Sequence, residues 1–226
     1  MQCICSIFFE GQFTRMMRDA EGKPKSGAVM RDAGVADKKA ALRARMLALR
    51  RSIPESLRID MSRAIAGHVS GLPEIIDAHH IHLYLAIRSS AEVDTTAIID
   101  RLSTMGKELA VPVVMDGNLV AAAFQKGDPV LPAQFGQPEP EDVSVVDESL
   151  IEVVLIPLLA FDGTGCRLGY GKGLYDSFLQ HLSAQGRRVC RIGLAFSRQM
   201  VDRVPADQWD EALDAVAHEH GIIRFT

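Results

Sequence analysis

The chain has 226 residues, of which 47% are hydrophobic and 24% charged, the balance of an ordinary folded protein. This composition excludes a disordered chain, a collagen and a coiled coil. Lysine and arginine number 25 against 29 aspartate and glutamate, a net charge of −4. The chain therefore lacks the overall positive charge of a nucleic-acid coat, no nucleic-acid partner is expected, and any anion site must be local.

The N-terminal residues differ in pattern from the rest. Residues 1–34 show no sustained hydrophobic period and are predicted to be an extension outside the fold. Residues 35–226 are predicted to form a single α/β domain of ordinary size. No stretch approaches the roughly 18 apolar residues of a membrane span, so no membrane partner is expected. Four scattered cysteines do not make a secreted disulfide framework, and a reducing compartment, the cytoplasm, is expected.

Hydrophobic spacing predicts the elements of the first half of the domain. In chain order they are helices over 37–53 and 57–72, a strand over 81–85, a helix over 95–105, and strands over 109–114 and 119–124. Asp37 is placed to cap the first helix, and Pro54 and Pro73 are placed to end the first two. The turn sequence Asp116-Gly117 lies between the last two strands and predicts a hairpin.

The second half of the domain predicts the centre of a parallel sheet. Residues 128–142 hold four prolines and are expected to be irregular. Residues 151–156 are almost wholly apolar and β-branched, which is typical of a central strand buried on both faces. A helix from Leu174, ended by Gly186, and a strand over 189–194 follow. The alternation of strands and helices favours an α/β fold with a mainly parallel sheet.

The strongest chemical signal is a loop with five glycines in residues 163–173, placed between the buried strand and a helix. Backbone amides at such a place face outward, and the helix dipole favours an anion, most often phosphate. Arg167 and Lys172 add positive charge. The loop is not a Walker A motif, because Gly173 follows the lysine and Cys166 occupies the position of the first glycine. A lid or a plain tight turn is the alternative interpretation.

Three further groups of residues carry weaker signals. Asp176 lies in the first turn of the predicted helix, where a carboxylate either complements the helix dipole or holds a divalent cation. Lys39, Arg43 and Arg50 share one face of the first helix, and a solvated face is the favoured interpretation of that pattern. The histidines at 79–82 have no cysteine or glutamate partner at ligand spacing and are expected at a strand edge.

Six blocks of sequence together resemble one known family. They are Lys39 with Leu42 and Arg43, then residues 91–95 (AEVDT), 135–140 (FGQPEP), 155–162 (LIPLLAFD), 167–176 (RLGYGKGLYD) and 213–216 (LDAV). In this order they resemble the 5-formyltetrahydrofolate cyclo-ligases, also called methenyltetrahydrofolate synthetases, from about Asp37 to the C-terminus. The resemblance implies a three-layer α/β/α fold similar to the sugar-phosphate isomerase and CoA-transferase group.

The resemblance also implies a reaction, the ATP- and Mg²⁺-dependent closure of 5-formyltetrahydrofolate to 5,10-methenyltetrahydrofolate, with release of ADP and phosphate. Phosphorylation of the formyl oxygen makes it a leaving group, and N10 of the folate then attacks the activated carbon. Such a transfer depends on alignment and charge neutralisation rather than on a protein nucleophile. The implied partner is the small-molecule folate, and a monomer is expected.

By resemblance, residues of this chain receive roles in that reaction. The implied catalytic residues are Lys172 and Arg167. The implied ATP contacts are Lys39, Arg43, Arg167, Leu168, Gly169, Tyr170, Gly171, Lys172, Gly173, Leu174 and Tyr175. The implied folate contacts are Glu92, Tyr170 and Leu174, and the implied Mg²⁺ ligands are Asp176 and Asp210.

This sequence departs from the family at two places. Leu174 stands where the family commonly has a tyrosine, and the segment 86–91 before Glu92 is longer than usual. A relative that binds nucleotide or folate without closing the ring is therefore the alternative function. A phosphosugar isomerase on the same general fold is a third possibility, and the two sets of cations with Asp176 suit a nucleotide better.

Overall fold

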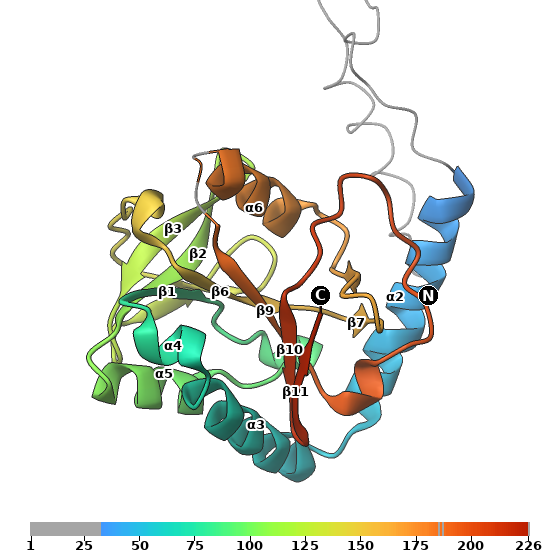
Figure 1. The fold of residues 1–226 in the computed structure, drawn as a ribbon, viewed down its shortest axis with the longest axis horizontal. Helices are drawn as coiled ribbons and strands as arrows, with labels where there is room; N and C mark the ends of the chain where they lie inside the picture. Colours follow the sequence, from blue (N-terminus) through green and yellow to red (C-terminus); the bar gives the residue numbers. More distant parts are fainter. Residues whose placement is uncertain (1–32, 185, 187, 226) are drawn as a thin grey trace, which may run out of the picture.

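A computed structural model describes residues 33–184, 186 and 188–225, which form a seven-stranded sheet with helices on both faces (Figure 1). The helices are α2 (Ala33–Ser52), α3 (Glu55–Ser70), α4 (Pro73–Asp77), α5 (Thr96–Thr104) and α6 (Leu174–Ala184). The strands of the large sheet are β1 (His80–Leu83), β2 (Glu108–Met115), β3 (Asn118–Phe124), β6 (Val153–Pro157), β9 (Cys190–Leu194), β10 (Ala215–His218) and β11 (Gly221–Arg224). Among the described residues, no helix is both long and apolar enough to cross a membrane.

The sheet has the strand order β11-β10-β9-β6-β1-β2-β3. Its inner pairs are parallel, and only the edge pairs β2–β3 and β10–β11 are antiparallel. This confirms the predicted α/β fold with a mainly parallel sheet. The strand expected at the centre is β6, which lies fourth of the seven and is buried over Val153–Ile156.

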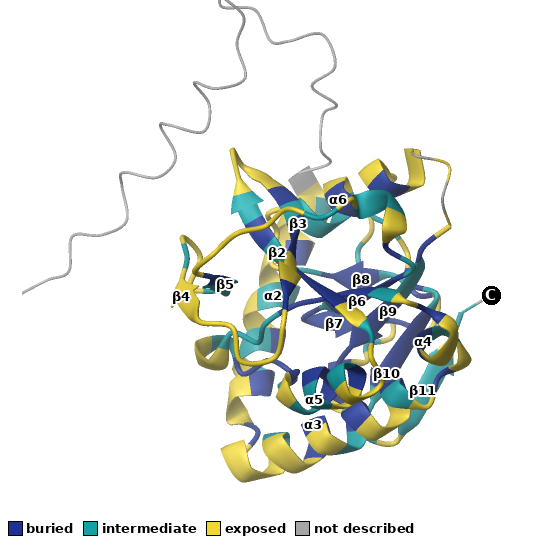
Figure 2. Ribbon diagram, turned by 90° about the vertical axis from the view of Figure 1, so that its left-hand side faces the viewer, coloured by how far each residue is buried: buried dark blue, intermediate teal, exposed yellow. Residues whose placement is uncertain are grey.

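Alternation along the strands divides the core between the two faces of the sheet. Val153 and Leu155 of β6 pack in one cluster with apolar residues of α3, α4 and α5. Val154 and Ile156 pack in the other cluster with α6, through Phe178 among others. Figure 2 shows the result, with buried strands between helices whose outward faces are exposed.

Several predicted boundaries change. Helix α2 begins at Ala33, so Asp37 lies inside the helix and does not cap it. The predicted extension, residues 1–34, lies outside the described residues except for Ala33 and Gly34, which belong to α2. Pro73, expected only to end a helix, is the first residue of α4, a position that requires no backbone N–H. The predicted hairpin is confirmed, because Asp116 and Gly117 both have positive φ between the paired strands β2 and β3.

The segment 128–142, expected to be irregular, contains a short antiparallel ribbon. Strands β4 (Val130–Pro132) and β5 (Pro138–Pro140) pair with each other and with no strand of the large sheet. Prolines are tolerated because both strands are edge strands. Two strands that the sequence did not predict, β10 and β11, complete the far edge of the sheet.

Candidate active site

A cavity of about 660 Å³ opens beside the glycine-rich loop, in the size range of small-molecule sites. Parts of the chain that are far apart in sequence line it. Among them are helix α2, the segment around Glu92, the β2–β3 hairpin, residues 135–138, residues 167–177, and the segment 207–210 between the sheet strands β9 and β10. Every residue to which the resemblance gives a role lies in its wall, from Lys39 to Asp210. The sequence therefore identified residues that the fold brings together.

The glycine-rich loop consists of two parts with different structural roles. Its first part is the turn of a small hairpin, β7 (Ala160–Phe161) with β8 (Arg167–Leu168). The Asp162 carboxylate organises this turn by accepting hydrogen bonds from Thr164, Cys166 and Val204. Burial raises the pKa of Asp162, but these hydrogen bonds outweigh it and hold the pKa below its ordinary value. Gly163 and Gly165 thus belong to a tight structural turn. For this part of the loop, the alternative interpretation of the sequence, a plain tight turn, is the right one.

The second part of the loop, residues 169–173, lines the cavity. Arg43 of α2, which also lines the cavity, holds the loop in place, with Nε donating to the Gly169 carbonyl at 3.0 Å. Gly171 has φ +90°, and a Cβ added there would lie 3.0 Å from Arg43 Cζ. Glycine is thus needed at position 171 for both its backbone angle and its closeness to the arginine.

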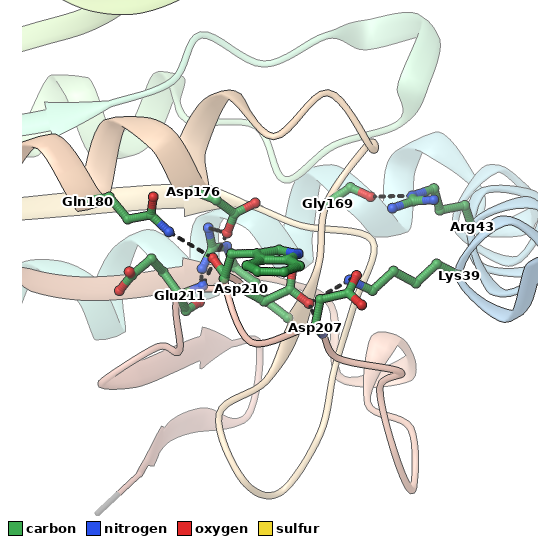
Figure 3. A network of polar contacts seen from close by, with 10 residues as sticks. Lys39, Arg43, Gly169, Asp176, Gln180, Asp207, Asp210 and Glu211 are labelled. Atoms are coloured by element: carbon green, nitrogen blue, oxygen red, sulfur yellow. Dashed lines mark hydrogen bonds and ion pairs between the residues drawn. The ribbon is translucent and has the colours of Figure 1, made fainter. Parts of the chain in front are cut away.

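The predicted row Lys39, Arg43 and Arg50 of α2 is not a solvated face, contrary to the interpretation favoured from the sequence. Lys39 is 7% exposed and Arg50 only 1%. Lys39 Nζ lies 2.8 Å from Asp207 Oδ2 and 2.5 Å from Asp210 Oδ2, joining α2 to the segment before β10 (Figure 3). The Asp207 amide donates to the same Asp210 oxygen at 2.8 Å. Asp207 is a site residue that the sequence did not reveal.

A second ion pair joins Arg167 of β8 to Asp176 of α6, with Nη2 and Oδ1 2.7 Å apart. The Glu211 amide donates to Asp176 Oδ1 at 3.2 Å, and the Glu211 carbonyl accepts from Arg167 Nη1. Burial lowers the pKa of Arg167, and the nearby Asp176 carboxylate opposes that effect. Figure 3 shows Asp176 and Asp210 in the same network of polar contacts; Asp210 is paired with Lys39 and Asp176 with Arg167.

Glu92 also lines the cavity and is 7% exposed. Its Oε2 accepts from the Ile87 amide at 2.6 Å, and its Oε1 accepts from the Tyr170 hydroxyl. Burial raises the pKa of Glu92, while Tyr170, the Ile87 amide and the charge of Arg50 each act to lower it. Arg50 donates to the Tyr170 oxygen at 2.5 Å. The only sequence signal for Arg50 was its helical spacing from Lys39 and Arg43.

Aromatic side chains complete the wall of the cavity. Lys172 Nζ lies 5.1 Å from the centroid of the Phe135 ring, which connects the glycine-rich loop to the β4–β5 ribbon. The Tyr175 hydroxyl is buried and has no hydrogen-bond partner among the described residues. The Tyr175 ring lies edge-on to buried His82 of β1, with centroids 6.1 Å apart. Neither Phe135 nor His82 was predicted as a site residue.

The described residues contain no cluster of three or more histidine, cysteine, aspartate or glutamate side chains arranged for a metal ion. Asp176 and Asp210 each leave one carboxylate oxygen with no hydrogen bond to a described residue. Two carboxylates fit Mg²⁺ in the form in which it accompanies a nucleotide, when phosphates and waters supply the other ligands.

Comparison with known proteins finds similar proteins over most of the chain. The sequence model of the "5-formyltetrahydrofolate cyclo-ligase family" matches residues 35–219. The 5-formyltetrahydrofolate cyclo-ligase of Escherichia coli K12 is 31% identical, covering 74% of this chain and 92% of that protein. The enzyme of the same name from Mycolicibacterium smegmatis is 32% identical, covering 79% of this chain and 92% of its own. The structure of Aquifex aeolicus 5,10-methenyltetrahydrofolate synthetase is similar, with a TM-score of 0.72 and 29% identity over 82% of this chain and 92% of that one.

Proposed function

The chain belongs to the 5-formyltetrahydrofolate cyclo-ligase family, and from that premise we propose how its cavity carries out the family's reaction. The protein is an ATP-dependent ligase of one-carbon metabolism that converts 5-formyltetrahydrofolate to 5,10-methenyltetrahydrofolate. One observation carries the proposal for its site: the cation and carboxylate pairs and buried Glu92 line one and the same cavity. Such a cavity holds a nucleotide at one end and a folate at the other.

The reaction explains why none of the proposed catalytic residues is a nucleophile. The formyl oxygen of the folate takes the terminal phosphoryl group of ATP, and ADP leaves. N10 then attacks the formyl carbon, the C–O bond breaks, phosphate departs and N10 loses its proton. Each step needs positive charge near the moving phosphoryl group and fixed alignment of the reacting atoms. We assign the positive charge to Lys172 and Arg167.

At the nucleotide end, Lys39, Arg43 and the backbone amides of 169–173 bind phosphate oxygens, with Leu168, Leu174 and Tyr175 bordering the nucleotide. Lys39 and Arg167 carry carboxylate partners in the structure. Phosphate oxygens replace those carboxylates when the nucleotide binds, which frees Asp210 and Asp176 for Mg²⁺. When bound, Mg²⁺ neutralises negative charge on the transferred phosphoryl group.

At the folate end, Glu92, Tyr170 and Leu174 contact the pterin ring and the N5 region. Glu92 offers a buried oxygen acceptor to a ring N–H, and Leu174 offers an apolar surface. Three broader expectations stay with this proposal: the domain is a monomer, it works in the cytoplasm, and its layered fold is related to the sugar-phosphate isomerase and CoA-transferase group.

The direct test uses purified protein with 5-formyltetrahydrofolate and MgATP. We expect the methenyl product, followed by its absorbance, to appear with one ADP per product. ADP formed without the methenyl product would contradict the proposal. Binding of both ligands with no turnover would favour a relative that does not close the ring, as the Leu174 departure allows.

A further inference from the structure

We propose that Arg50, which lies behind the cavity wall, is a positioning residue that fixes the direction of the Tyr170 hydroxyl and so presents Glu92 to the folate as a hydrogen-bond acceptor. The inference rests on the proposed function for one point only, the contact between Glu92 and folate. The order of the hydrogen bonds follows from the structure alone.

Arg50 joins three separate parts of the chain. Its Nε donates to the Ser90 carbonyl at 2.7 Å and its Nη1 to the Leu158 carbonyl at 3.1 Å. Its Nη2 donates to the Tyr170 oxygen at 2.5 Å, and the guanidinium carbon lies 5.6 Å from the Tyr170 ring centroid. Helix α2, the segment before Glu92, the end of β6 and the glycine-rich loop therefore meet at one side chain.

The Ser90 contact bears directly on Glu92. Residue Ala91, between them, has φ 52°, in the left-handed region that residues with a side chain rarely adopt. Such a conformation persists where neighbouring contacts enforce it. By fixing the Ser90 carbonyl, Arg50 helps to hold the turn that brings Glu92 into the cavity wall.

The direction of the hydroxyl hydrogen follows from the chemistry of the donors. A guanidinium only donates hydrogen bonds, so Tyr170 must accept from Arg50. The hydroxyl hydrogen is then directed to the other neighbour of the Tyr170 oxygen, Glu92 Oε1. The chain of donation runs from Arg50 to Tyr170 to Glu92, and Glu92 is an acceptor at its end.

The charges around Glu92 support this order. Burial raises the pKa of Glu92, and the positive charge of Arg50 opposes it. The other titratable groups facing Glu92 from the described residues are Tyr84 after β1, Tyr170 of the loop and Tyr175 of α6. Burial raises the pKa of all three tyrosines, so they are neutral when Glu92 titrates. Arg50 is thus the cation that favours ionised Glu92.

The test compares Arg50→Met and Arg50→Lys with Arg51→Met. Arg51 is an exposed neighbour on the same helix that donates to the adjacent Ser89 carbonyl, so it is a matched control. For Arg50→Met we expect the acidic limb of kcat/KM for 5-formyltetrahydrofolate to move to higher pH by about one unit, a roughly tenfold loss on that limb. We expect Arg50→Lys to recover part of this loss, KM for ATP to change little, and Arg51→Met to match the wild type.

A double-mutant cycle separates positioning from general damage. Because Arg50 acts partly through the Tyr170 hydroxyl and partly through its charge, the pH shift of the double variant should be clearly smaller than the sum of the shifts of Arg50→Met and Tyr170→Phe. Additive shifts, or an unshifted limb in Arg50→Met, would overturn the proposal. If Arg50→Met does not fold, Arg50→Lys and Tyr170→Phe still give the comparison: unshifted limbs in both would overturn it.

A titration of the Glu92 carboxyl carbon by NMR, assigned with Glu92→Gln, reads the same effect without turnover. A higher pKa of Glu92 in Arg50→Met than in the wild type supports the inference even if the protein forms no product. An unchanged pKa overturns it. A different result would count against the proposed function itself. If the wild type turns over normally and Glu92→Gln has the same KM for the folate as the wild type, Glu92 does not belong to the folate site.

Discussion

Lys39 and Asp210 lie 171 positions apart in sequence, yet Lys39 Nζ and Asp210 Oδ2 are 2.5 Å apart at the edge of the cavity. The pair shows that cations of this site are already paired with carboxylates of the chain. Each cation proposed for phosphate binding near the segment 207–211 is already held by a carboxylate, as Arg167 is by Asp176. In the proposed mechanism, binding of a magnesium nucleotide is then an exchange of partners, in which phosphate oxygens take the place of carboxylates that already hold these cations.

Lys39→Met tests this exchange. We expect KM for ATP to rise at least tenfold, because phosphate loses a cation, while KM for the folate changes little. The free energy of unfolding should fall by about 1–3 kcal/mol, because Asp207 and Asp210 lose their partner. Steady-state kinetics and urea unfolding measure both. The same change at exposed Lys38 is the control, and equal effects at the two positions would remove Lys39 from the nucleotide site.

Asp176→Asn should alter the dependence on magnesium. We expect the Mg²⁺ concentration for half-maximal rate to rise several-fold, because an amide is a weaker ligand than a carboxylate. Asp100→Asn is the matched control, since Asp100 is paired with Lys126 at 2.8 Å and does not line the cavity. An unchanged magnesium dependence in Asp176→Asn, measured at saturating ATP, would show that Asp176 does not hold the metal.

Gly171→Ala tests the close contact between the loop and Arg43. An alanine at φ +90° is strained, and its Cβ would press on Arg43, so we expect a rise of roughly tenfold or more in KM for ATP. Gly127→Ala provides the control, because Gly127 has φ +99° but nothing within 4 Å of an added Cβ. Both variants should lose about 1 kcal/mol of stability, and only Gly171→Ala should lose nucleotide affinity. Equal ATP kinetics in the two variants would argue against a phosphate cradle at this part of the loop.

Lys172→Ala separates catalysis from stability. The side chain is exposed and its ammonium lies near the Phe135 ring, so the free energy of unfolding should fall by no more than about 1 kcal/mol. We expect kcat/KM for ATP to fall roughly 10- to 100-fold. Lys126→Ala, also at an exposed lysine, is the control. A large loss of stability with normal kinetics would mean that Lys172 has a structural role.

Local patterns predicted the parts of this protein that local physics determines. Helical spacing located α3 and α5, and the turn chemistry of Asp116-Gly117 located the β2–β3 hairpin. The burial of Lys39 and Arg50 was not predictable in this way, because it depends on Asp210 and Tyr170 from distant parts of the chain. Helical spacing alone is the same for a solvated face and for a buried row of cations.

The glycine-rich loop shows the same limit. Its composition indicated an anion site, and only the fold shows that Asp162 uses the first glycines for a hairpin turn. In the segment 128–142 the prolines predicted no regular element, and that prediction was wrong. They did not exclude the isolated β4–β5 ribbon, because the backbone of an edge strand need not donate at every residue.

His82 gives a prediction about pH and stability. This histidine of β1 is fully buried, neither ring nitrogen has a hydrogen-bond partner among the described residues, and burial lowers its pKa to about 3. Between the ordinary value of 6.5 and about 3, the unfolded chain therefore binds a proton that the folded chain does not. Stability contributed by neutral His82 is fully present above pH 6.5 and is lost as pH falls toward 3.

His82→Leu should remove this pH dependence. From pH 7.5 to 4.5, the wild type should lose about 2–3 kcal/mol more than His82→Leu, because each pH unit below 6.5 costs about 1.4 kcal/mol. Urea unfolding at the two pH values measures the difference. The same change at His79, which is exposed, should leave the wild-type dependence in place. The prediction fails if His82→Leu loses as much stability as the wild type over this range. In that case the folded protein binds a proton at His82 as readily as the unfolded chain does, and the buried side chain carries a positive charge at low pH.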